Sequence, residues 1–351
     1  MARTAVILFN LGGPDNLDAV KPFLRNLFSD PAIIGAPAPI RRFLSWYIST
    51  RRAARSRGIY AKIGGSSPIR LQTEKQARAL EQALADMGEV KAFPSMRYWH
   101  PFSDQVAKLV ADFNPDQIVL LPLYPQFSTT TSGSSLADWR RTAQVAGLSA
   151  PERTVCCYAQ DEGFIAAEVE LILPLLQAAR STGPTRLLLS AHGLPKKIID
   201  RGDPYQWQVE QTCAAIAAGL AAAGFDDLDY QVCYQSRVGP LEWIGPSTED
   251  EIIRAGDDGQ AVVLAPVAFV SEHSETLVEL DMDYRDLATK HGISHYARVP
   301  TVGTQRVFIQ GLANLVRQAS VWPDGQARCG TNAGQRCCPA GMAGCGIGPG
   351  I

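Results

Sequence analysis

Two imidazoles and a series of carboxylates are the side chains of this sequence best suited to chemistry on a metal ion. His192 comes at the end of a short apolar run, and Gly193 and Pro195 prevent a strand from continuing beyond it. A buried strand that delivers one imidazole to its carboxyl end is typical of ligand sites in open α/β sheets. The alternative interpretation is that His192 only ends a core strand.

A second apolar run, residues 261–269, ends in the same way and leads into His273 and several acidic residues. Three or four residues separate successive carboxylates in this series, which comprises Glu272, Glu275, Glu279 and Asp283. At ~100° per residue this spacing predicts one stripe of an α-helix, and such a stripe is ordinarily a solvated acidic face. Beside two imidazoles, crowded carboxylates also suit proton relay or the transient capture of Fe²⁺ or a similar first-row ion.

The composition is that of a globular protein without a strong charge bias. The chain has 351 residues, of which 46% are hydrophobic and 19% charged, and its formal net charge is -2. A net charge this small provides no global field for nucleic acid. The N-terminus lacks the pattern of a signal peptide, and no apolar run approaches the ~18 residues of a membrane span. We therefore expect a cytoplasmic protein that is long enough for two domains.

Strand-like and helix-like segments alternate along the whole chain, which predicts an α/β fold with parallel sheets flanked by helices. The segment Leu8–Pro14 resembles Leu189–Pro195, and residues 120–128 loosely resemble 264–271. We interpret these likenesses as a duplication that produces two similar α/β domains whose strand ends face one cleft. In this register Leu11 corresponds to His192, so one wall of the cleft is expected to be apolar and the other to carry the chemistry. A flat, mostly apolar ligand would suit such a cleft.

We expect the first domain to span residues 1–150 and the second, carrying His192 and Glu275, to span 151–305. A C-terminal helix (306–320) and a tail rich in cysteine and glycine (321–351) follow. Between Asp30 and Glu74 there is no acidic residue, whereas basic residues occur at Arg41, Arg42, Arg51, Arg52, Arg55, Arg57, Lys62 and Arg70.

Apolar residues recur at helical spacing in the first part of this basic segment, at Ile40, Phe43, Leu44, Tyr47 and Ile48. A basic helix with an apolar stripe, at about residues 30–60, is expected to contact a membrane surface or to form the lip of the cleft for an anionic ligand. The alternative is a core-facing helix with a solvated basic side.

The eight cysteines fall into two groups. The first group is scattered and is expected to consist of reduced core residues, namely Cys156, Cys157, Cys213 and Cys233. The second group is crowded into the tail and comprises Cys329, Cys337, Cys338 and Cys345. A reducing compartment disfavours disulfides, and the paired C-x-x-C spacing of structural zinc sites is missing. The tail is therefore expected to bind a metal ion or a metal cluster, with an unliganded reduced tail as the alternative.

Several motifs, in the family's order, resemble ferrochelatase between about Ala5 and Leu315. They are Asn10–Pro14, Tyr60 with Ile63–Ile69, Arg97–Tyr98 with His100–Pro101, Tyr124–Gln126, Ser190–Pro195, Arg201–Tyr205, Tyr234–Pro240 with Trp243, and Phe269–Asp281. The resemblance implies insertion of Fe²⁺ into protoporphyrin IX with release of two protons, the final step of haem synthesis, on two Rossmann-like domains.

By position, the resemblance assigns His192 and Glu275 to iron, with His192 as ligand or base, and His273 and Glu279 to support of the site and the proton path. Glu272 stands where relatives often have aspartate. The porphyrin-binding positions are Arg51, Arg52, Tyr60 and Ser67 for the propionates, Arg97, Tyr98 and Trp243 for the pocket lining, and Leu11 from the internal register.

The resemblance also implies a [2Fe–2S] cluster on the tail cysteines. Thr129 occupies the position of the separate upstream ligand of the animal enzymes, so all four ligands would come from the tail unless Cys156 or Cys157 contributes. Peripheral contact with the inner membrane face and handover of the porphyrin from the preceding haem-pathway enzyme are further expectations. The alternatives are a chelatase for coproporphyrin or cobalt and a non-catalytic haem or iron–sulfur sensor. The sequence leaves open the oligomeric state and the iron donor.

Overall fold

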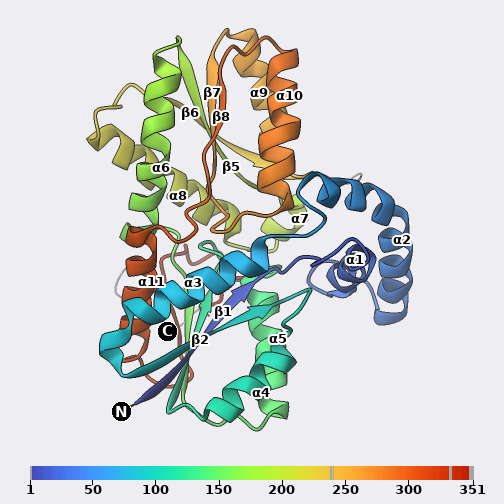
Figure 1. Ribbon diagram of the computed structural model, residues 1–351, viewed down its shortest axis with the longest axis vertical. Helices are drawn as coiled ribbons and strands as arrows, with labels where there is room; N and C mark the ends of the chain where they lie inside the picture. Colours follow the sequence, from blue (N-terminus) through green and yellow to red (C-terminus); the bar gives the residue numbers. More distant parts are fainter. Residues whose placement is uncertain (1, 238, 240, 332–333, 348–351) are drawn as a thin grey trace.

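Two parallel sheets organise the chain in the computed structural model, which describes residues 2–237, 239, 241–331 and 334–347 (Figure 1). The first sheet has the strand order β2-β1-β3-β4-β9, and the second has the order β6-β5-β7-β8. The strands of the first sheet are β1 (Arg3–Asn10), β2 (Glu89–Met96), β3 (Gln117–Pro122), β4 (Glu152–Cys157) and β9 (Ala327–Cys329). The strands of the second sheet are β5 (Thr185–His192), β6 (Asp229–Gln235), β7 (Ala261–Pro266) and β8 (Tyr296–Arg298).

Helices connect the strands and cover both faces of each sheet, so the expected α/β fold is confirmed. The helices of the first half are α1 (Val20–Ser29), α2 (Ala38–Lys62), α3 (Ile69–Ala83), the 3₁₀ turn η1 (Ala85–Met87), α4 (Ser103–Phe113) and α5 (Ser132–Val145). Those of the second half are α6 (Glu162–Arg180), α7 (Lys196–Ile199), α8 (Tyr205–Ala222), α9 (Thr248–Asp257), the π-helix η2 (Glu275–Asp283), α10 (Tyr284–Lys290) and α11 (Arg306–Ala319).

Alternate side chains of the central strands enter separate apolar cores, as the period of a strand requires. In the first sheet, Val6 and Leu8 pack with α3 and α11, whereas Ile7 and Phe9 pack with α4 and α5. In the second sheet, Leu187 packs with α6 and α8, and the opposite face of the sheet packs with α9 and α10. The two sheets are therefore buried on both faces, and only the ends of their strands are available for chemistry.

Helix α6 connects the two halves, because it starts beside α11 and continues along the second sheet (Figure 1). The approach of α6 to α11 is very close at a pair of glycines. A Cβ atom at Gly163 would lie 2.7 Å from the carbonyl oxygen of Val307 and 2.8 Å from the Cα of Gly311. Larger side chains at this crossing would force the two helices apart, which would alter the relative position of the sheets.

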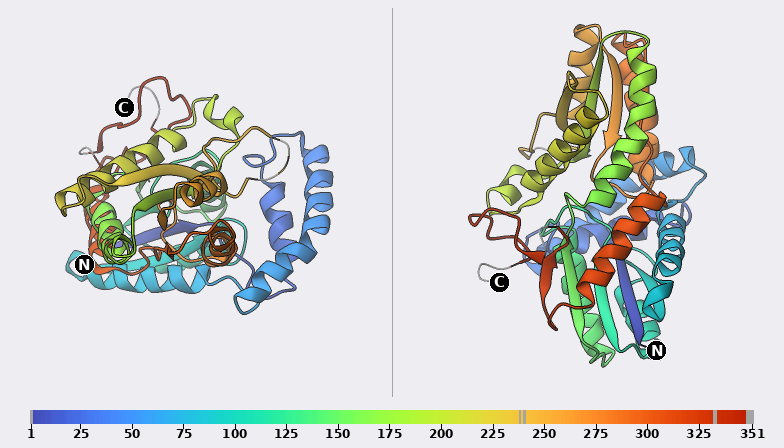
Figure 2. Two further views of the ribbon diagram at one scale, coloured as in Figure 1. Left: turned by 90° about the horizontal axis from the view of Figure 1, so that it is seen from above. Right: turned by 90° about the vertical axis from the view of Figure 1, so that its left-hand side faces the viewer.

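Strand β4 differs from the expected domain organisation. Its residues, 152–157, were expected in the second domain, but β4 pairs with β3 in the first sheet, and β9 from the tail pairs with β4 at the edge (Figure 2). A short apolar run predicts a buried parallel strand without indicating which sheet it joins. In the part of the chain that the structure describes, no helix is both long enough and apolar enough to cross a membrane.

Candidate functional site

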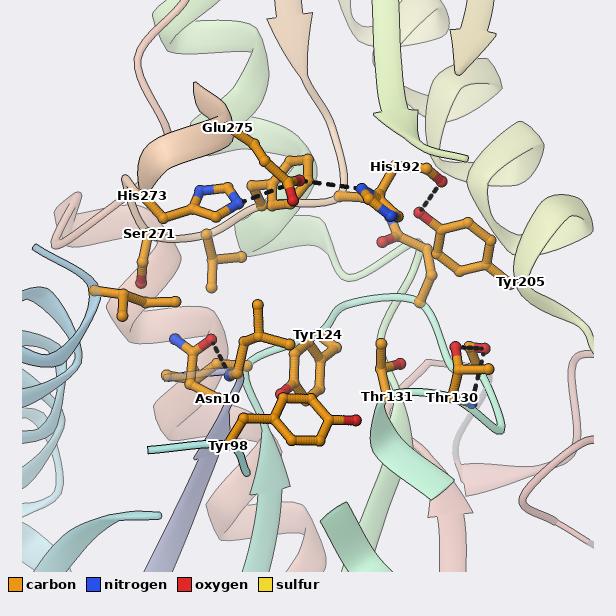
Figure 3. A pocket seen from close by; sticks show the side chains of 18 of the residues that line it. Asn10, Tyr98, Tyr124, Thr130, Thr131, His192, Tyr205, Ser271, His273 and Glu275 are labelled. Atoms are coloured by element: carbon orange, nitrogen blue, oxygen red, sulfur yellow. Dashed lines mark hydrogen bonds and ion pairs between the residues drawn. The ribbon is translucent and has the colours of Figure 1, made fainter. Parts of the chain in front are cut away.

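A pocket lies between the carboxyl ends of the two sheets (Figure 3). Three lining residues of the second half carry imidazole or carboxylate groups: His192 at the end of β5, His273 just before η2, and Glu275 at the start of η2. We call these three residues the imidazole wall. From the first half comes a set of mostly apolar side chains that we call the apolar wall, namely Leu11, Leu27, Ile69, Tyr98 and Leu123. This arrangement agrees with the expectation of a cleft with one apolar and one chemical wall.

Glu275 joins the two imidazoles of the imidazole wall. Its Oε2 atom lies 3.0 Å from Nδ1 of His192 and 3.5 Å from Nε2 of His273. The side chains of His192 and Glu275 keep 37% and 30% of their surface exposed, whereas His273 is buried. The ring of His273 also packs against Phe269, with 4.6 Å between the ring centroids. The pair that faces the pocket therefore consists of an imidazole and a carboxylate within reach of one ion.

Buried polar contacts from the first half hold the loop before η2. Gln76 on α3 is fully buried, and its Nε2 donates to the carbonyl oxygens of Val270 (2.7 Å) and Gly303 (2.9 Å). Its Oε1 accepts a hydrogen bond from Ser271 (3.0 Å). Because both ends of one amide are used, the position of His273 depends on a helix of the other half.

The charges of the imidazole wall shift the pKa values of its members in opposite directions. Burial alone would lower the pKa of His192, but the Glu275 carboxylate outweighs burial and raises it. Burial alone would raise the pKa of Glu275, but His192 and then His273 hold it well below its usual range. Burial and the charge of Glu275 raise the pKa of Glu279. The wall therefore favours an imidazolium–carboxylate pair with a second carboxyl group nearby that retains its proton more readily.

Glu279 is held from the strand end next to His192. The backbone N–H of Ser236 donates to its Oε1 (2.9 Å), the hydroxyl of Ser236 donates to its Oε2 (2.5 Å), and Tyr284 donates to Oε1 (3.1 Å). Ser236 has φ +63°, in the left-handed region that non-glycine residues rarely adopt. That conformation aims both donors of one residue at a single carboxylate.

The expected α-helical acidic stripe is wrong, because residues 275–283 form a π-helix. Hydrogen bonds that span five residues misalign side chains spaced by three or four. Glu272 precedes this helix and binds Arg298, with 2.6 Å between Oε1 and the guanidinium. Asp283 lies on the surface, where its Oδ1 accepts from Lys62 at 2.9 Å. Of the stripe, Glu275 faces the pocket and Glu279 lies half-buried beside it.

The other residues expected to bind a porphyrin lie at different distances from the pocket. Leu11 and Tyr98 line it, and the Tyr98 hydroxyl donates to Asp30 (2.8 Å). Tyr60 is buried beside Ser274, and burial raises its pKa to about 12.

Two arginines of α2 face different sides of that helix. Arg52 is half-buried and lies over the ring of Phe28, and burial and the neighbouring Arg55 lower the pKa of its guanidinium. Arg51 is exposed and lies over the ring of Tyr47, 5.7 Å from its centroid. Arg52 is therefore the more enclosed of the two, whereas Arg51 belongs to the outer surface.

Six of the eight expected positions are outside the pocket lining: Arg51, Arg52 and Tyr60, described above, and Ser67, Arg97 and Trp243. Ser67 is buried under Gly13, where a Cβ on the glycine would lie 2.5 Å from the Ser67 Cβ. Arg97 forms an ion pair with Asp30 (2.9 Å) beside a second, shallower hollow. Trp243 packs over the turn after His192, where a Cβ at Gly193 would lie 3.3 Å from its ring. These three side chains support the walls in this structure.

The sequence interpretation did not select Tyr205 or Tyr124 as site residues, although both line the pocket. The Tyr205 hydroxyl donates to the backbone oxygen of His192 (3.0 Å), so it fixes the strand end that carries the imidazole (Figure 3). Both tyrosines belong to motifs of the resemblance, and this was the available signal. Periodicity does not distinguish them from core tyrosines.

Comparison with known proteins agrees with this site. The sequence profile of the family described as Ferrochelatase matches residues 3–320. The chain belongs to the ferrochelatase family. The Ferrochelatase of Caulobacter vibrioides is 56% identical over 320 residues, which are 90% of this chain and 90% of that protein. The Ferrochelatase of Hyphomonas neptunium is 48% identical over 348 residues, which are 98% of this chain and 94% of that protein.

Solved structures with similar folds also include chelatases. SirB from Bacillus subtilis with Fe³⁺ superimposes with a TM-score of 0.50 at 13% identity, over 92% of this chain and 96% of that chain. Sirohydrochlorin chelatase SirB from Bacillus subtilis subspecies spizizenii in complex with cobalt gives a TM-score of 0.50 at 10% identity, over 91% and 95% of the two chains. At these identities the likeness supports the fold. The expected ferrochelatase family and activity, iron insertion into a porphyrin in haem synthesis, are confirmed by the sequence matches.

The cysteines of this ferrochelatase gather in a second site. All four tail cysteines lie in one buried cluster together with Cys156 and Cys157. Because β9 pairs with β4, Cys157 and Cys329 are partners, with 3.7 Å between their sulfurs. The sulfurs of Cys157, Cys329 and Cys337 all lie within 4.8 Å of one another. Cys156 and Cys157 are therefore not scattered core residues, because the edge strand brings the tail to them.

The arrangement of these sulfurs fits an iron–sulfur group, because iron is held by cysteine sulfurs brought to one place. Without a metal the protons are shared unequally: hydrogen bonds from Cys157 and Cys329 lower the pKa of Cys337, and hydrogen bonds from Cys156 and Cys338 lower the pKa of Cys345 to about 3. The pKa values of Cys156, Cys157, Cys329 and Cys338 are raised. Among the described residues the cysteines form no disulfides.

Proposed function

We propose that this chain is a protoporphyrin ferrochelatase in which His192 and Glu275 receive Fe²⁺ over the centre of the porphyrin. The observation that supports this most strongly is the 3.0 Å contact between these side chains, which come from different elements and face a cleft with a mostly apolar surface. Nitrogen and oxygen ligands without thiolate suit a ferrous ion that must be released. The cavity of ≈ 220 Å³ surrounds only part of a macrocycle, because pockets that enclose a whole drug-sized ligand measure ~300–1,000 Å³.

A free-base porphyrin must lose two N–H protons before a metal can enter. Neutral His192 is the proposed acceptor of these protons, which it takes one at a time and passes on before it accepts the next or binds Fe²⁺, and the Glu275 carboxylate stabilises the imidazolium that forms in between. Glu279 is the proposed next group on the proton path, since Ser236 and Tyr284 hold it near this pair. His273 orients Glu275 from its buried side. The apolar wall supplies the binding energy for a strained ring.

We assign the propionate groups to the side of the pocket that faces α2. Arg52 and Tyr60 lie there, and Arg51 lies further out on the same helix. Ser67, Arg97 and Trp243 are proposed to act through the walls that they support. In this account Leu11 and Tyr98 contact the ring itself.

The test is an anaerobic insertion assay that compares protoporphyrin IX with coproporphyrin, and Fe²⁺ with Co²⁺. The proposal predicts the highest kcat/KM for Fe²⁺ with protoporphyrin IX. Preference for coproporphyrin or cobalt would replace the substrate assignment within the same family. Tight haem binding without any insertion would support the sensor alternative and reject the proposal.

We further propose that the cysteine cluster binds a [2Fe–2S] group. The proposed ligands include Cys157, Cys329 and Cys337, and the fourth comes from the neighbouring tail thiols, Cys338 or Cys345. When bound, this group cross-links the tail to β4 and supplies a redox-active centre, whereas metal insertion itself transfers no electrons. Cys157→Ala should abolish the visible iron–sulfur absorption, and Cys213→Ala, a buried cysteine on α8 outside the cluster, should preserve it.

We also propose that one face of α2 contacts the inner membrane surface. Its aromatic and aliphatic side chains are unusually exposed: Ile40 53%, Phe43 60%, Trp46 48% and Tyr47 43%. The helix has no acidic residue and several arginines, which suits anionic lipid. Cosedimentation with anionic vesicles should be lost in Phe43→Ser/Trp46→Ser and retained in Val145→Ser, an exposed apolar residue on α5. Delivery of the porphyrin by the preceding enzyme at the same membrane is part of this proposal.

A further inference from the structure

One buried amide touches both the cysteine cluster and the pocket segment. Gln208, in the first turn of α8, is 1% exposed. Its Nε2 lies 3.0 Å from Sγ of Cys338 and 3.4 Å from Sγ of Cys157. Its Oε1 accepts a hydrogen bond from the backbone N–H of Phe127 (2.7 Å). The orientation of the amide is fixed, because only its oxygen can accept from that N–H and only its nitrogen can donate to the sulfurs.

The segment that Gln208 holds is part of the pocket lining. Gln126, Ser128, Thr130 and Thr131 line the pocket on both sides of Phe127 in the sequence. Gln126 is buried, and its Nε2 donates to Thr212 (2.9 Å) on α8 and to the backbone oxygen of Val267 (3.1 Å). Phe127 itself packs among the cysteines. The segment 126–131 is therefore fixed between α8, the end of β7 and the cysteine tail.

The tail has a second attachment, which reaches the same segment through Gly202 and Asp203. The N–H of Gly344 donates to the backbone oxygen of Gly202 (3.0 Å), and Gly202 has φ +89° with no room for a Cβ, which would lie 2.8 Å from the nitrogen of Ala343. The neighbouring Asp203 accepts from the backbone N–H of Thr129 (2.8 Å) and from that of Tyr205 (3.0 Å).

These contacts lead to the imidazole wall, because the Tyr205 hydroxyl donates to the backbone oxygen of His192. We propose that Gln208 is a positioning residue that makes the porphyrin-binding shape of segment 126–131 depend on the state of the cysteine cluster. This inference rests on the proposed function for the identity of the ligand and of the cluster, and it adds a coupling between the two sites.

When the thiols bind iron, their sulfurs stay in place as acceptors for the Gln208 amide, and its oxygen stays aligned with Phe127. Loss of the cluster removes these acceptors from fixed positions, so the amide is free to turn and the Phe127 N–H loses its partner. A buried donor without a partner is unfavourable, and the segment then relaxes away from the pocket. Porphyrin affinity should fall even though no residue of the imidazole wall has changed.

The experiment measures the Kd of protoporphyrin IX by quenching of protein fluorescence, without metal and therefore without turnover. Gln208→Met keeps the length of the side chain and removes both hydrogen-bonding groups. Its Kd should rise about fivefold, as expected for one lost buried hydrogen bond. Gln206→Met, on the outer side of the same helix where Gln206 binds only Glu210, is the matched control and should keep the wild-type Kd.

Coupling is tested by combining this variant with loss of the cluster. Cys337→Ala should raise the Kd of the wild-type background by a similar factor, and Cys337→Ala/Gln208→Met should be no weaker than either single variant. A second readout does not depend on porphyrin. The reduction potential of the cluster, followed through its visible absorption, should become more negative in Gln208→Met, because N–H···S hydrogen bonds stabilise the reduced cluster. Cys338→Ala removes one sulfur acceptor without changing α8 and should raise the Kd in the same direction.

An unchanged Kd in Gln208→Met would overturn the coupling. So would a Kd of Cys337→Ala/Gln208→Met that rises by the product of the factors measured for the two single variants. Insertion activity measured at saturating porphyrin separates this outcome from failure of the proposed function. An active wild-type enzyme with an insensitive Kd rejects only the coupling, whereas an inactive wild-type protein rejects the proposed function.

Discussion

The two walls of the pocket lie at the carboxyl ends of the two sheets, but they carry opposite kinds of side chain. The imidazole wall presents charged groups that are paired with one another, and hydrogen bonds of Gln76 and Tyr205 fix the backbone that carries them. The apolar wall presents aliphatic and aromatic surface, and its Asp30 and Arg97 are paired behind that surface. The reacting groups therefore lie on one wall and the ring-binding surface on the other. Substitutions in the imidazole wall should change kcat, and substitutions in the apolar wall should change the KM for porphyrin.

The largest expected effect comes from removing the imidazole. His192→Ala should lower kcat by ~10²–10⁴-fold, the usual contribution of a positioned general base, with little change in the KM for porphyrin because the apolar wall is intact. The measurement is haem formation at saturating porphyrin under anaerobic conditions. His100→Ala, an exposed histidine outside the pocket, is the control. A raised KM with normal kcat would contradict the division between the walls.

The charge of Glu275 should set the acidic limb of the pH profile. Burial lowers the pKa of His192, but the charge of Glu275 raises it by more. The neutral form of His192 is therefore lost as the pH falls through a value above ~6.5. Glu275→Gln removes the charge and keeps the shape, so the acidic limb of kcat/KM should move to lower pH. The same pKa shift contributes to the free energy of unfolding. This contribution is fully present below pH ~6.5 and is lost as the pH rises through the pKa of His192 in the folded protein. An unmoved limb would show that another group controls the profile.

On the apolar wall, Leu11→Ala should raise the KM for porphyrin about tenfold, because a few buried methyl or methylene groups in a pocket contribute ~1–3 kcal/mol. The kcat should stay within a factor of two or three of wild type, since the imidazole wall is unchanged. Steady-state kinetics at varied porphyrin and saturating iron separate the two constants. A fall in kcat with constant KM would place Leu11 with the chemistry.

The smallest effects distinguish the inner from the outer carboxylates of η2. Ser236→Ala removes one of three donors to Glu279 and should lower kcat by about twofold to tenfold, the range for one hydrogen bond that contributes ~0.5–1.5 kcal/mol. Asp283→Asn removes a surface ion pair with Lys62 and should leave kcat unchanged, because such pairs contribute about 0–1 kcal/mol. Equal effects of the two substitutions would indicate that the whole acidic series acts as one path.

The position of His192 at a strand end could be predicted because strand ends are visible in the sequence. An apolar run that stops at glycine or proline indicates where His192 must emerge, and the order of strands and helices indicates a parallel sheet. The contact of His192 with Glu275 follows from two such ends in one sheet. The π-helix was not predictable, since Glu272, Glu275 and Glu279 have spacing that also suits an α-helix. The partner of Glu272, Arg298, lies far along the sequence and leaves no periodic signal.

Only part of the cysteine cluster could be predicted from the sequence, because its members come from distant segments. The tail cysteines are adjacent in sequence, so their association could be expected. Cys157 joins them only because β9 adds to the edge of β4, and edge pairing between distant strands is not encoded in local spacing. The adjacent pair Cys156–Cys157 was the one signal available. Gln208 gave none, because a glutamine in an amphipathic helix is ordinary.

The most direct test of the central claim is an anomalous difference map from crystals of the protein soaked anaerobically with Co²⁺ as a stand-in for Fe²⁺. The account predicts a peak in the pocket within bonding distance of both His192 and Glu275. A pocket peak that is bound to neither side chain, or cobalt only at the cysteine cluster while these two remain paired with each other, would contradict it.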